Sequence, residues 1–231
     1  MTATVYERTD IARDVFISVE SASLSGELVI PAAANGIVLF AHGSGSSRHS
    51  PRNQFVARVI RDGGVGTLLF DLLTPQEESI DAYTTHLRFD IGLLARRLVA
   101  ATNWLAVDKQ TKELTIGYFG ASTGGGAALV AAAELDGHVG AVVSRGGRPD
   151  LAGEALPFVT APTLLIVGGR DYPVIEMNRE ALAQLRCEKR LEIVPGATHL
   201  FEEPGTLEQV ARMAADWFVT HLERNEKHVS G

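Results

Sequence analysis

Three residues suited to nucleophilic catalysis occur along the chain in the order serine, aspartate, histidine. Ser122 lies in a Gly-x-Ser-x-Gly pattern at residues 120–124, Asp171 follows two glycines, and His199 follows a short glycine-containing turn. A serine hydroxyl is a weak nucleophile at neutral pH, so it needs an adjacent base and a third group that orients the base. The residue types and their order therefore predict acyl chemistry, with Ser122 as nucleophile, His199 as base and Asp171 as the orienting acid.

Each of these residues also has a plainer alternative role. The glycine-rich segment could be a tight strand-to-helix junction or a phosphate-binding loop that lacks its lysine. Asp171 could instead cap the helix expected after it, and His199 could be a solvated loop histidine. Three further acids could replace Asp171: Asp150, Glu202 and Glu203.

Attack on a carbonyl places negative charge on its oxygen, which backbone N–H groups can stabilise. The N–H of Thr123, directly after the nucleophile, is one expected donor. We expect the second donor in the small-residue loop at 42–50, at Ser44. The alternative for this loop is a flexible glycine-serine turn that caps the helix expected from Pro51.

The elements that must position these residues follow from short apolar runs that alternate with stretches of helical period. This pattern predicts an α/β fold with a mostly parallel eight-stranded sheet and helices on both faces. Strands are expected near Val15–Val19, Leu24–Ile30, Gly36–Ala41, Val65–Phe70, Leu114–Phe119, Val139–Ser144, Thr163–Val167 and Arg190–Val194. Helices are expected near Pro51–Asp62, Thr85–Ala106, Ser122–Glu134, Val174–Leu185 and Thr206–Glu223. The first two strands are too close for a crossover helix, so we expect an antiparallel hairpin at one edge.

Placement relative to the strands separates candidate site residues from the rest. Ligands bind beyond the carboxyl ends of parallel strands, where successive loops converge. Ser122, Asp171 and His199 each follow an expected strand, whereas His138 precedes one and is expected at the opposite end. The three candidates should therefore share one edge of the sheet.

Length and composition favour one globular domain over residues 1–231, with a frayed tail at 223–231. The chain has 45% hydrophobic and 21% charged residues, as is typical of a globular protein.

No apolar run approaches the roughly 20 residues that span a bilayer. The net charge of −7 argues against a nucleic-acid partner. The N-terminus lacks the features of a signal peptide, and Cys187 is the sole cysteine, so a cytoplasmic location is expected.

The assembled pattern resembles the α/β-hydrolase fold, and more narrowly its compact dienelactone-hydrolase-like branch. The residues that carry the resemblance are His42-Gly43, Gly120–Gly124, Gly169–Asp171 and Ala197–Phe201. The resemblance implies a nucleophile-acid-base triad of Ser122, Asp171 and His199. Dienelactone hydrolases have cysteine at the nucleophile, so Ser122 favours general ester chemistry over dienelactone. Related sequences also occur fused behind a phosphoribosyltransferase domain, and no segment here resembles that domain.

The expected function is hydrolysis of small or exposed carboxylic esters through an acyl-enzyme, without a metal or organic cofactor. An acyltransferase or perhydrolase with the same triad, and a non-catalytic binding protein of the same fold, are the alternatives. The segment between Ser144 and Thr163 is too short for a cap domain, so we expect an open, shallow site. The oligomeric state is left open.

Residues near the expected strand ends are candidates for substrate contacts. These are His42, Arg48, Arg145 and Phe201, and the segment Leu72–Tyr83 should supply further lining. Arg48 and Arg145, with Arg52 and Arg148 in neighbouring loops, could hold a substrate carboxylate or phosphate. Loop arginines also commonly form ion pairs at helix ends, which is the alternative role.

Overall fold

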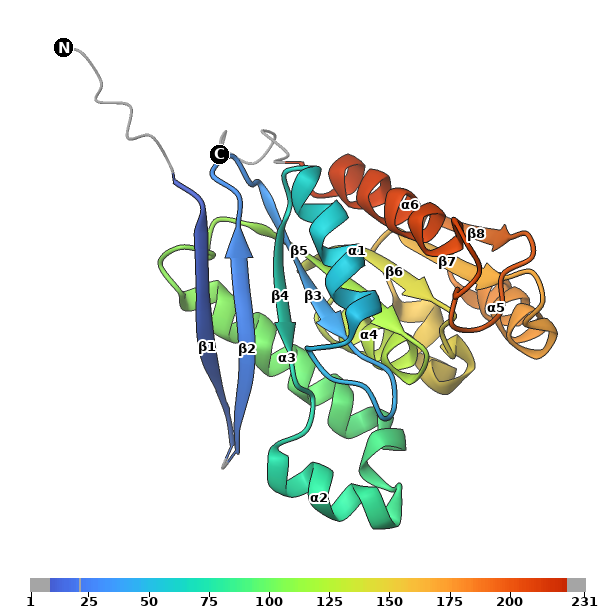
Figure 1. Cartoon of the computed structure of the whole chain (residues 1–231), viewed down its shortest axis with the longest axis horizontal. Coiled ribbons are helices and arrows are strands. Elements are labelled where there is room, and N and C mark those ends of the chain that lie inside the picture. Colours follow the sequence, from blue (N-terminus) through green and yellow to red (C-terminus); the bar gives the residue numbers. More distant parts are fainter. Residues whose placement is uncertain (1–8, 21, 224–231) are drawn as a thin grey trace.

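The computed structural model describes residues 9–20 and 22–223 and is built on one eight-stranded sheet (Figure 1). The strands lie in the order β1-β2-β4-β3-β5-β6-β7-β8. Their bounds are β1 Ile11–Val19, β2 Ala22–Ile30, β3 Gly36–Ala41, β4 Gly66–Phe70, β5 Thr115–Ala121, β6 Val139–Arg145, β7 Thr163–Gly168 and β8 Lys189–Val194. All eight strands predicted from the sequence are present, within a few residues of the expected bounds.

The sheet is antiparallel only at its N-terminal edge. β1 pairs with β2, and β2 pairs with β4, in antiparallel register. The pairs from β4–β3 to β7–β8 are parallel. This confirms the expected hairpin edge and the mostly parallel sheet, so the carboxyl ends of β3 to β8 point in one direction.

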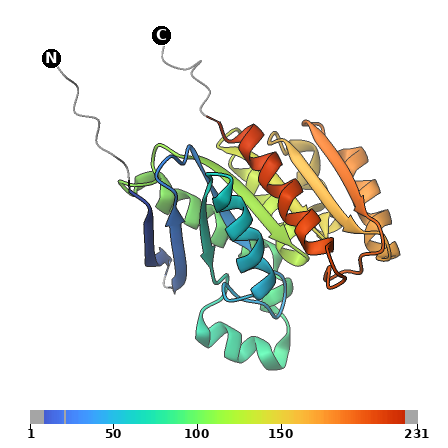
Figure 2. The same ribbon diagram turned by 45° about the horizontal axis from the view of Figure 1, so that its top comes forward.

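Helices cover both faces of the sheet, as predicted. One face carries α1 (Pro51–Asp62) and α6 (Thr206–His221), and the other carries α3 (Ile91–Val107), α4 (Thr123–Glu134) and α5 (Tyr172–Gln184) (Figures 1 and 2). Each face has its own hydrophobic core, centred on α3 and α4 on one side and on α1 and α6 on the other. Every residue of β3, β4 and β7 is buried, as expected for strands covered on both faces.

Two short helical segments were not among the predicted elements. The 3₁₀ segment η2 (Pro149–Phe158) follows β6. The helix α2 (Pro75–Thr84) follows β4 and lies beyond the strand ends, at the bottom of Figure 1. Thr74 and Glu77 form a capping box at its N-terminus, and this Thr-Pro-x-Glu signature was the sequence signal for it.

The helix predicted over Thr85–Ala106 also differs in the structure. It is divided into a short 3₁₀ turn, η1 (Leu87–Phe89), and α3. Asp90 separates the two because its side chain accepts a hydrogen bond from Leu93 N–H at 2.9 Å and caps α3. No helix within residues 9–20 and 22–223 is long and apolar enough to cross a membrane. Of the tail predicted at 223–231, all but Glu223 lies outside the described residues.

Candidate active site

Ser122 occupies the sharp turn between β5 and α4. Its backbone has φ 51° and ψ −123°, a region that side-chain-bearing residues rarely adopt. The Ser122 N–H donates to the carbonyl of Arg145 at 3.2 Å, and its carbonyl accepts from the N–H groups of Gly125 and Arg148 at 2.9 and 3.0 Å. Backbone groups at and just after the end of β6 therefore hydrogen-bond to both the N–H and the carbonyl of Ser122. Such a turn lifts a serine hydroxyl out of the sheet.

The turn can form only because glycines flank the serine. A Cβ at Gly124 would overlap the carbonyl oxygen of Ala41 at the end of β3. A Cβ at Gly120 would lie 2.5 Å from the carbonyl oxygen of Gly124. The strand and helix thus approach to a distance that excludes any side chain at these two positions.

Asp171 and His199 are in direct contact beyond the ends of β7 and β8. His199 Nδ1 lies 2.6 Å from Asp171 Oδ2. Asp171 stands at the N-cap position of α5, yet its side chain makes no capping hydrogen bond, so the carboxylate faces the histidine instead. This contact distinguishes Asp171 from the other acids considered.

The three rival acids are engaged elsewhere. Asp150 accepts from Arg148 at 2.7 Å, Glu202 lies 3.4 Å from Arg52, and Glu203 accepts from the Thr198 N–H at 3.0 Å. The hydrogen bond from the Thr198 N–H lowers the pKa of the Glu203 carboxyl below its usual value.

The His199 ring lies beside the strand end that holds Ser122. A Cβ at Gly146 would lie 3.5 Å from both Nδ1 and Cε1 of His199. Gly146 directly follows Arg145, whose carbonyl receives the Ser122 N–H. Within the described residues, no hydrogen bond joins the Ser122 side chain to His199. Contacts of this kind in hydrolases often tighten only when substrate is bound.

The loop after β3 reaches over the turn that holds Ser122. A Cβ at Gly43 would lie 3.1 Å from the Cβ of Ser122, and the N–H of Ser44 donates to the hydroxyl of Thr123 at 3.1 Å. The two predicted oxyanion donors are therefore neighbours, and in this structure the Ser44 N–H already has an acceptor.

His42 joins the ends of two strands. Its Nε2 accepts the Leu72 N–H at 3.0 Å, and its Nδ1 lies 3.1 Å from the carbonyl of Gly43. Because Nε2 is the acceptor, Nδ1 carries the proton and the ring is neutral. Burial lowers the pKa of His42 and favours this neutral form. The sequence predicts a substrate contact at His42, whereas both ring nitrogens are engaged within the protein.

Two other predicted substrate contacts are also engaged internally. The Arg48 guanidinium pairs with Asp71, which also accepts the Arg48 N–H at 2.9 Å. Phe201 is only 2% exposed, and its ring packs under Arg145, so it has almost no surface to offer a ligand. Arg145 is buried too, but no residue that the structure describes pairs with its charge.

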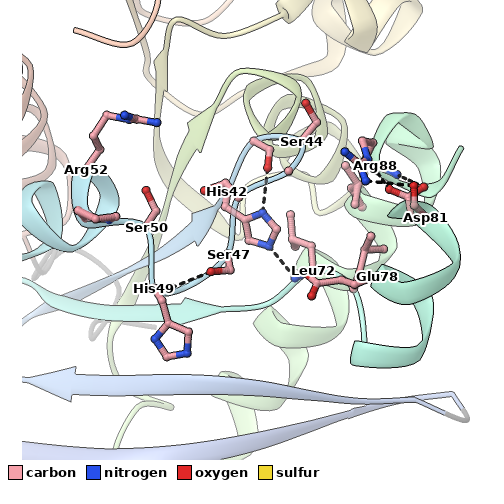
Figure 3. A pocket seen from close by; sticks show the side chains of 16 residues that line it. His42, Ser44, Ser47, His49, Ser50, Arg52, Leu72, Glu78, Asp81 and Arg88 are labelled. Atoms are coloured by element: carbon pink, nitrogen blue, oxygen red, sulfur yellow. Dashed lines mark hydrogen bonds and ion pairs between the residues drawn. The ribbon is translucent and has the colours of Figure 1, made fainter. Parts of the chain in front are cut away.

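A cavity of about 620 Å³ opens beside the loop that reaches over the Ser122 turn (Figure 3). Gly43 and Ser44, which reach over Ser122 and Thr123, line it together with Leu72 from the end of β4. Glu78 and Asp81 of α2 form its outer wall with Arg88, at the end opposite Arg52 (Figure 3). The lining expected from Leu72–Tyr83 is present, because Leu72, Glu78 and Asp81 border the cavity, whereas the open, shallow site stays a prediction. No group of three or more His, Cys, Asp or Glu among the described residues could hold a metal ion.

The sequence profile of the Dienelactone hydrolase family matches residues 27–223. The chain belongs to the dienelactone hydrolase family. Among solved structures, the crystal structure of dienelactone hydrolase from Anabaena variabilis ATCC 29413 is 63% identical in sequence to this chain. The match has a TM-score of 0.91 and includes 93% of this chain and 100% of that chain. Est1E from Butyrivibrio proteoclasticus shares the fold at 16% identity, with a TM-score of 0.74 over 90% of this chain and 98% of that one. The resemblance inferred from motifs is confirmed: the protein is a dienelactone-hydrolase-like α/β hydrolase.

Curated relatives of this family member come from two strains of Mycobacterium tuberculosis. Both carry the name "Putative phosphoribosyl transferase" and are 61% identical over 199 residues, which is 86% of this chain. The match spans only 44% of each relative. This chain therefore corresponds to less than half the length of those proteins.

Proposed function

We propose that this hydrolase cleaves small or exposed carboxylic esters through an acyl-enzyme formed on Ser122. The observation that carries the proposal is the 2.6 Å contact between His199 Nδ1 and Asp171 Oδ2, at the sheet edge where Ser122 sits in its strained turn. Such a contact fixes the histidine so that Nε2 is the nitrogen available to the nucleophile.

In the acylation step, His199 Nε2 takes the hydroxyl proton as Ser122 Oγ attacks the ester carbonyl. The N–H groups of Thr123 and Ser44 donate to the oxyanion, which replaces the Thr123 hydroxyl as the acceptor for Ser44. One such donor is typically worth about 3 kcal/mol in the transition state. The tetrahedral intermediate then collapses, and His199 returns its proton to the departing alcohol while Asp171 supports the imidazolium charge.

In the deacylation step, water takes the place of the alcohol. His199 removes a proton from the water as it attacks the acyl-enzyme, and the same two N–H groups hold the second oxyanion. Collapse releases the carboxylic acid and returns the proton to Ser122. No step requires a metal or organic cofactor.

The name of the mycobacterial relatives points to a different chemistry, phosphoribosyl transfer. Because this chain matches only 44% of each relative, we assign hydrolysis to the matched part and the named transfer to the remainder. The features on which hydrolysis depends, namely the serine turn and the acid–base contact, all lie within the matched family residues 27–223.

The test is labelling with a fluorophosphonate probe, which reacts with activated serines. The wild-type protein should be labelled once, at Ser122, and should turn over p-nitrophenyl acetate. Ser122→Ala should lose both, whereas Ser144→Ala, at the buried end of the neighbouring strand, should keep labelling. Absence of labelling in folded wild-type protein contradicts the proposal.

The same assay separates the alternatives left open by the sequence. Turnover in the presence of an added alcohol or peroxide, with product analysis, distinguishes hydrolysis from acyl transfer or perhydrolysis. Ester turnover that survives Ser122→Ala would make the triad irrelevant, and folded wild-type protein that shows neither labelling nor turnover would favour the non-catalytic binding protein.

A further inference from the structure

The guanidinium of Arg145, at the end of β6, is buried and has no counter-ion among residues 9–20 and 22–223. Arg145 is 7% exposed, and its Nε and Nη1 atoms are buried with no hydrogen-bond partner. A buried charge is costly unless it is paired and hydrogen-bonded. An uncompensated cation at this position therefore points to a partner that the described part of the chain does not supply.

The surroundings of Arg145 contain an aromatic ring and a second cation. The guanidinium lies 6.0 Å from the centroid of the Phe201 ring, and the nearby charge is that of Arg52 on α1. Within the described residues, no carboxylate forms an ion pair with Arg145. Burial, together with Arg52, lowers the pKa of Arg145 to about 10, so the group remains a cation at neutral pH.

Three other arginines at this edge, Arg48, Arg52 and Arg148, already have acidic partners. Arg48 pairs with Asp71, and Arg148 pairs with Asp150 through two hydrogen bonds of 2.8 and 2.7 Å. Arg52 has the weakest pairing, a 3.4 Å contact with Glu202, whose side chain is 64% exposed. Exposed ion pairs of this kind contribute little to stability, so an incoming anion can replace Glu202 at small cost.

Arg145 also lies next to the reacting groups. Its carbonyl accepts the Ser122 N–H, and the next residue, Gly146, borders the His199 ring. Arg52 lines the cavity that opens beside the nucleophile turn. Arg52 therefore lines the cavity, while Arg145 lies at the strand end beside the Ser122 turn.

We propose that Arg145 and Arg52 form a subsite for an oxyanion, a carboxylate or a phosphate, carried by the substrate. The subsite deepens the proposed function and rests on it. A planar guanidinium donates to two oxygens of a carboxylate or a phosphate at once. The Phe201 ring packs against the face of the Arg145 guanidinium and supports it. The substrate class is accordingly an ester that carries a negative charge.

The test measures anion binding separately from turnover. Glutarate and inorganic phosphate are titrated into the Ser122→Ala protein by calorimetry and thermal shift, alone and combined with Arg145→Met, Arg145→Lys or Arg148→Met. We expect at least one anion to bind, a loss of tenfold or more in affinity with Arg145→Met, partial retention with Arg145→Lys, and little change with Arg148→Met. Binding of glutarate alone identifies a carboxylate, and binding of phosphate alone identifies a phosphate ester.

Arg145→Met should fold, because it replaces an unpaired buried charge with an apolar chain of similar length. Failure of both anions to bind, or equal binding with and without Arg145, overturns the subsite. Ester turnover by the wild-type protein without anion binding would leave the proposed function standing and remove the subsite. Anion binding without fluorophosphonate labelling would remove the proposed function while retaining an anion site.

Discussion

The backbone N–H of Leu72 donates to Nε2 of His42 across 3.0 Å, joining the loop after β3 to the end of β4. The histidine is 6% exposed and also contacts the Gly43 carbonyl. This one neutral ring therefore fixes the loop that carries Ser44 over the nucleophile turn.

We predict that His42 makes the protein less stable in mild acid. Burial holds the pKa of His42 below its usual value of 6.5, so near and below pH 6.5 the unfolded chain binds more protons than the folded protein. Stability therefore rises with pH through this window and falls as the pH drops. His42→Gln can still accept the Leu72 N–H but does not titrate, so its urea midpoint should depend less on pH between about 7.5 and 5.5. His138→Gln, at an exposed position, should retain the wild-type slope, and an unchanged slope in His42→Gln would contradict the prediction.

Asp171→Asn should reduce kcat on p-nitrophenyl acetate by about 10³- to 10⁴-fold with little change in melting temperature, because the amide no longer orients His199 or supports its charge. The matched change Asp150→Asn, which alters only the pair with Arg148, should lower kcat less than about twofold. Comparable losses in the two variants would point to a general effect on the sheet edge rather than to the His199 contact.

Thr123→Val should lower kcat/KM by roughly tenfold, since it removes the hydroxyl that holds the Ser44 N–H in place while keeping the side-chain shape. Thr123→Ser keeps the acceptor and should remain within about threefold of wild type. Steady-state kinetics check both variants. A Val variant that is faster than wild type would show that the hydroxyl competes with the substrate oxyanion.

Gly124→Ala should destabilise the protein by about 3 kcal/mol or prevent folding, because the new methyl group would overlap the Ala41 carbonyl. The same substitution at Gly92, in the first turn of α3, meets only contacts of 3.4 Å or more. It should be stabilising by up to about 1 kcal/mol through helix propensity. Chemical denaturation measures both, and similar effects at the two sites would exclude the close approach as the cause.

The sheet could be predicted from the sequence because its strands are buried on both faces. Strands such as β3 and β7 consist entirely of buried residues, and a continuous apolar run between turn residues marks them. The helix α2 has no such signature: Ile80 and Tyr83 are 59% and 91% exposed, so apolar periodicity does not reveal it. Only its capping residues do.

The contacts of the candidate site also fall into two groups, those that the sheet topology predicts and those that it does not. The proximity of Asp171 and His199 follows from their places after adjacent parallel strands, a rule that needs only topology. Whether Arg48 and Arg145 have acidic partners depends on which acid reaches which guanidinium in three dimensions, and the sequence offers several acids for each. The burial of Phe201 likewise depends on a positive φ of 56°, which no local pattern at that residue predicts.

The helix α2 forms one wall of the cavity yet belongs to neither hydrophobic core. Substitutions on it can reshape the pocket without disturbing the glycine-packed turn beneath. Under the proposed function, catalysis depends on residues 120–124, whereas substrate selectivity depends in part on α2. Libraries aimed at new substrates should accordingly vary residues 75–84 other than Glu77 and Asp81, which hold the helix in place, and leave residues 120–124 unchanged.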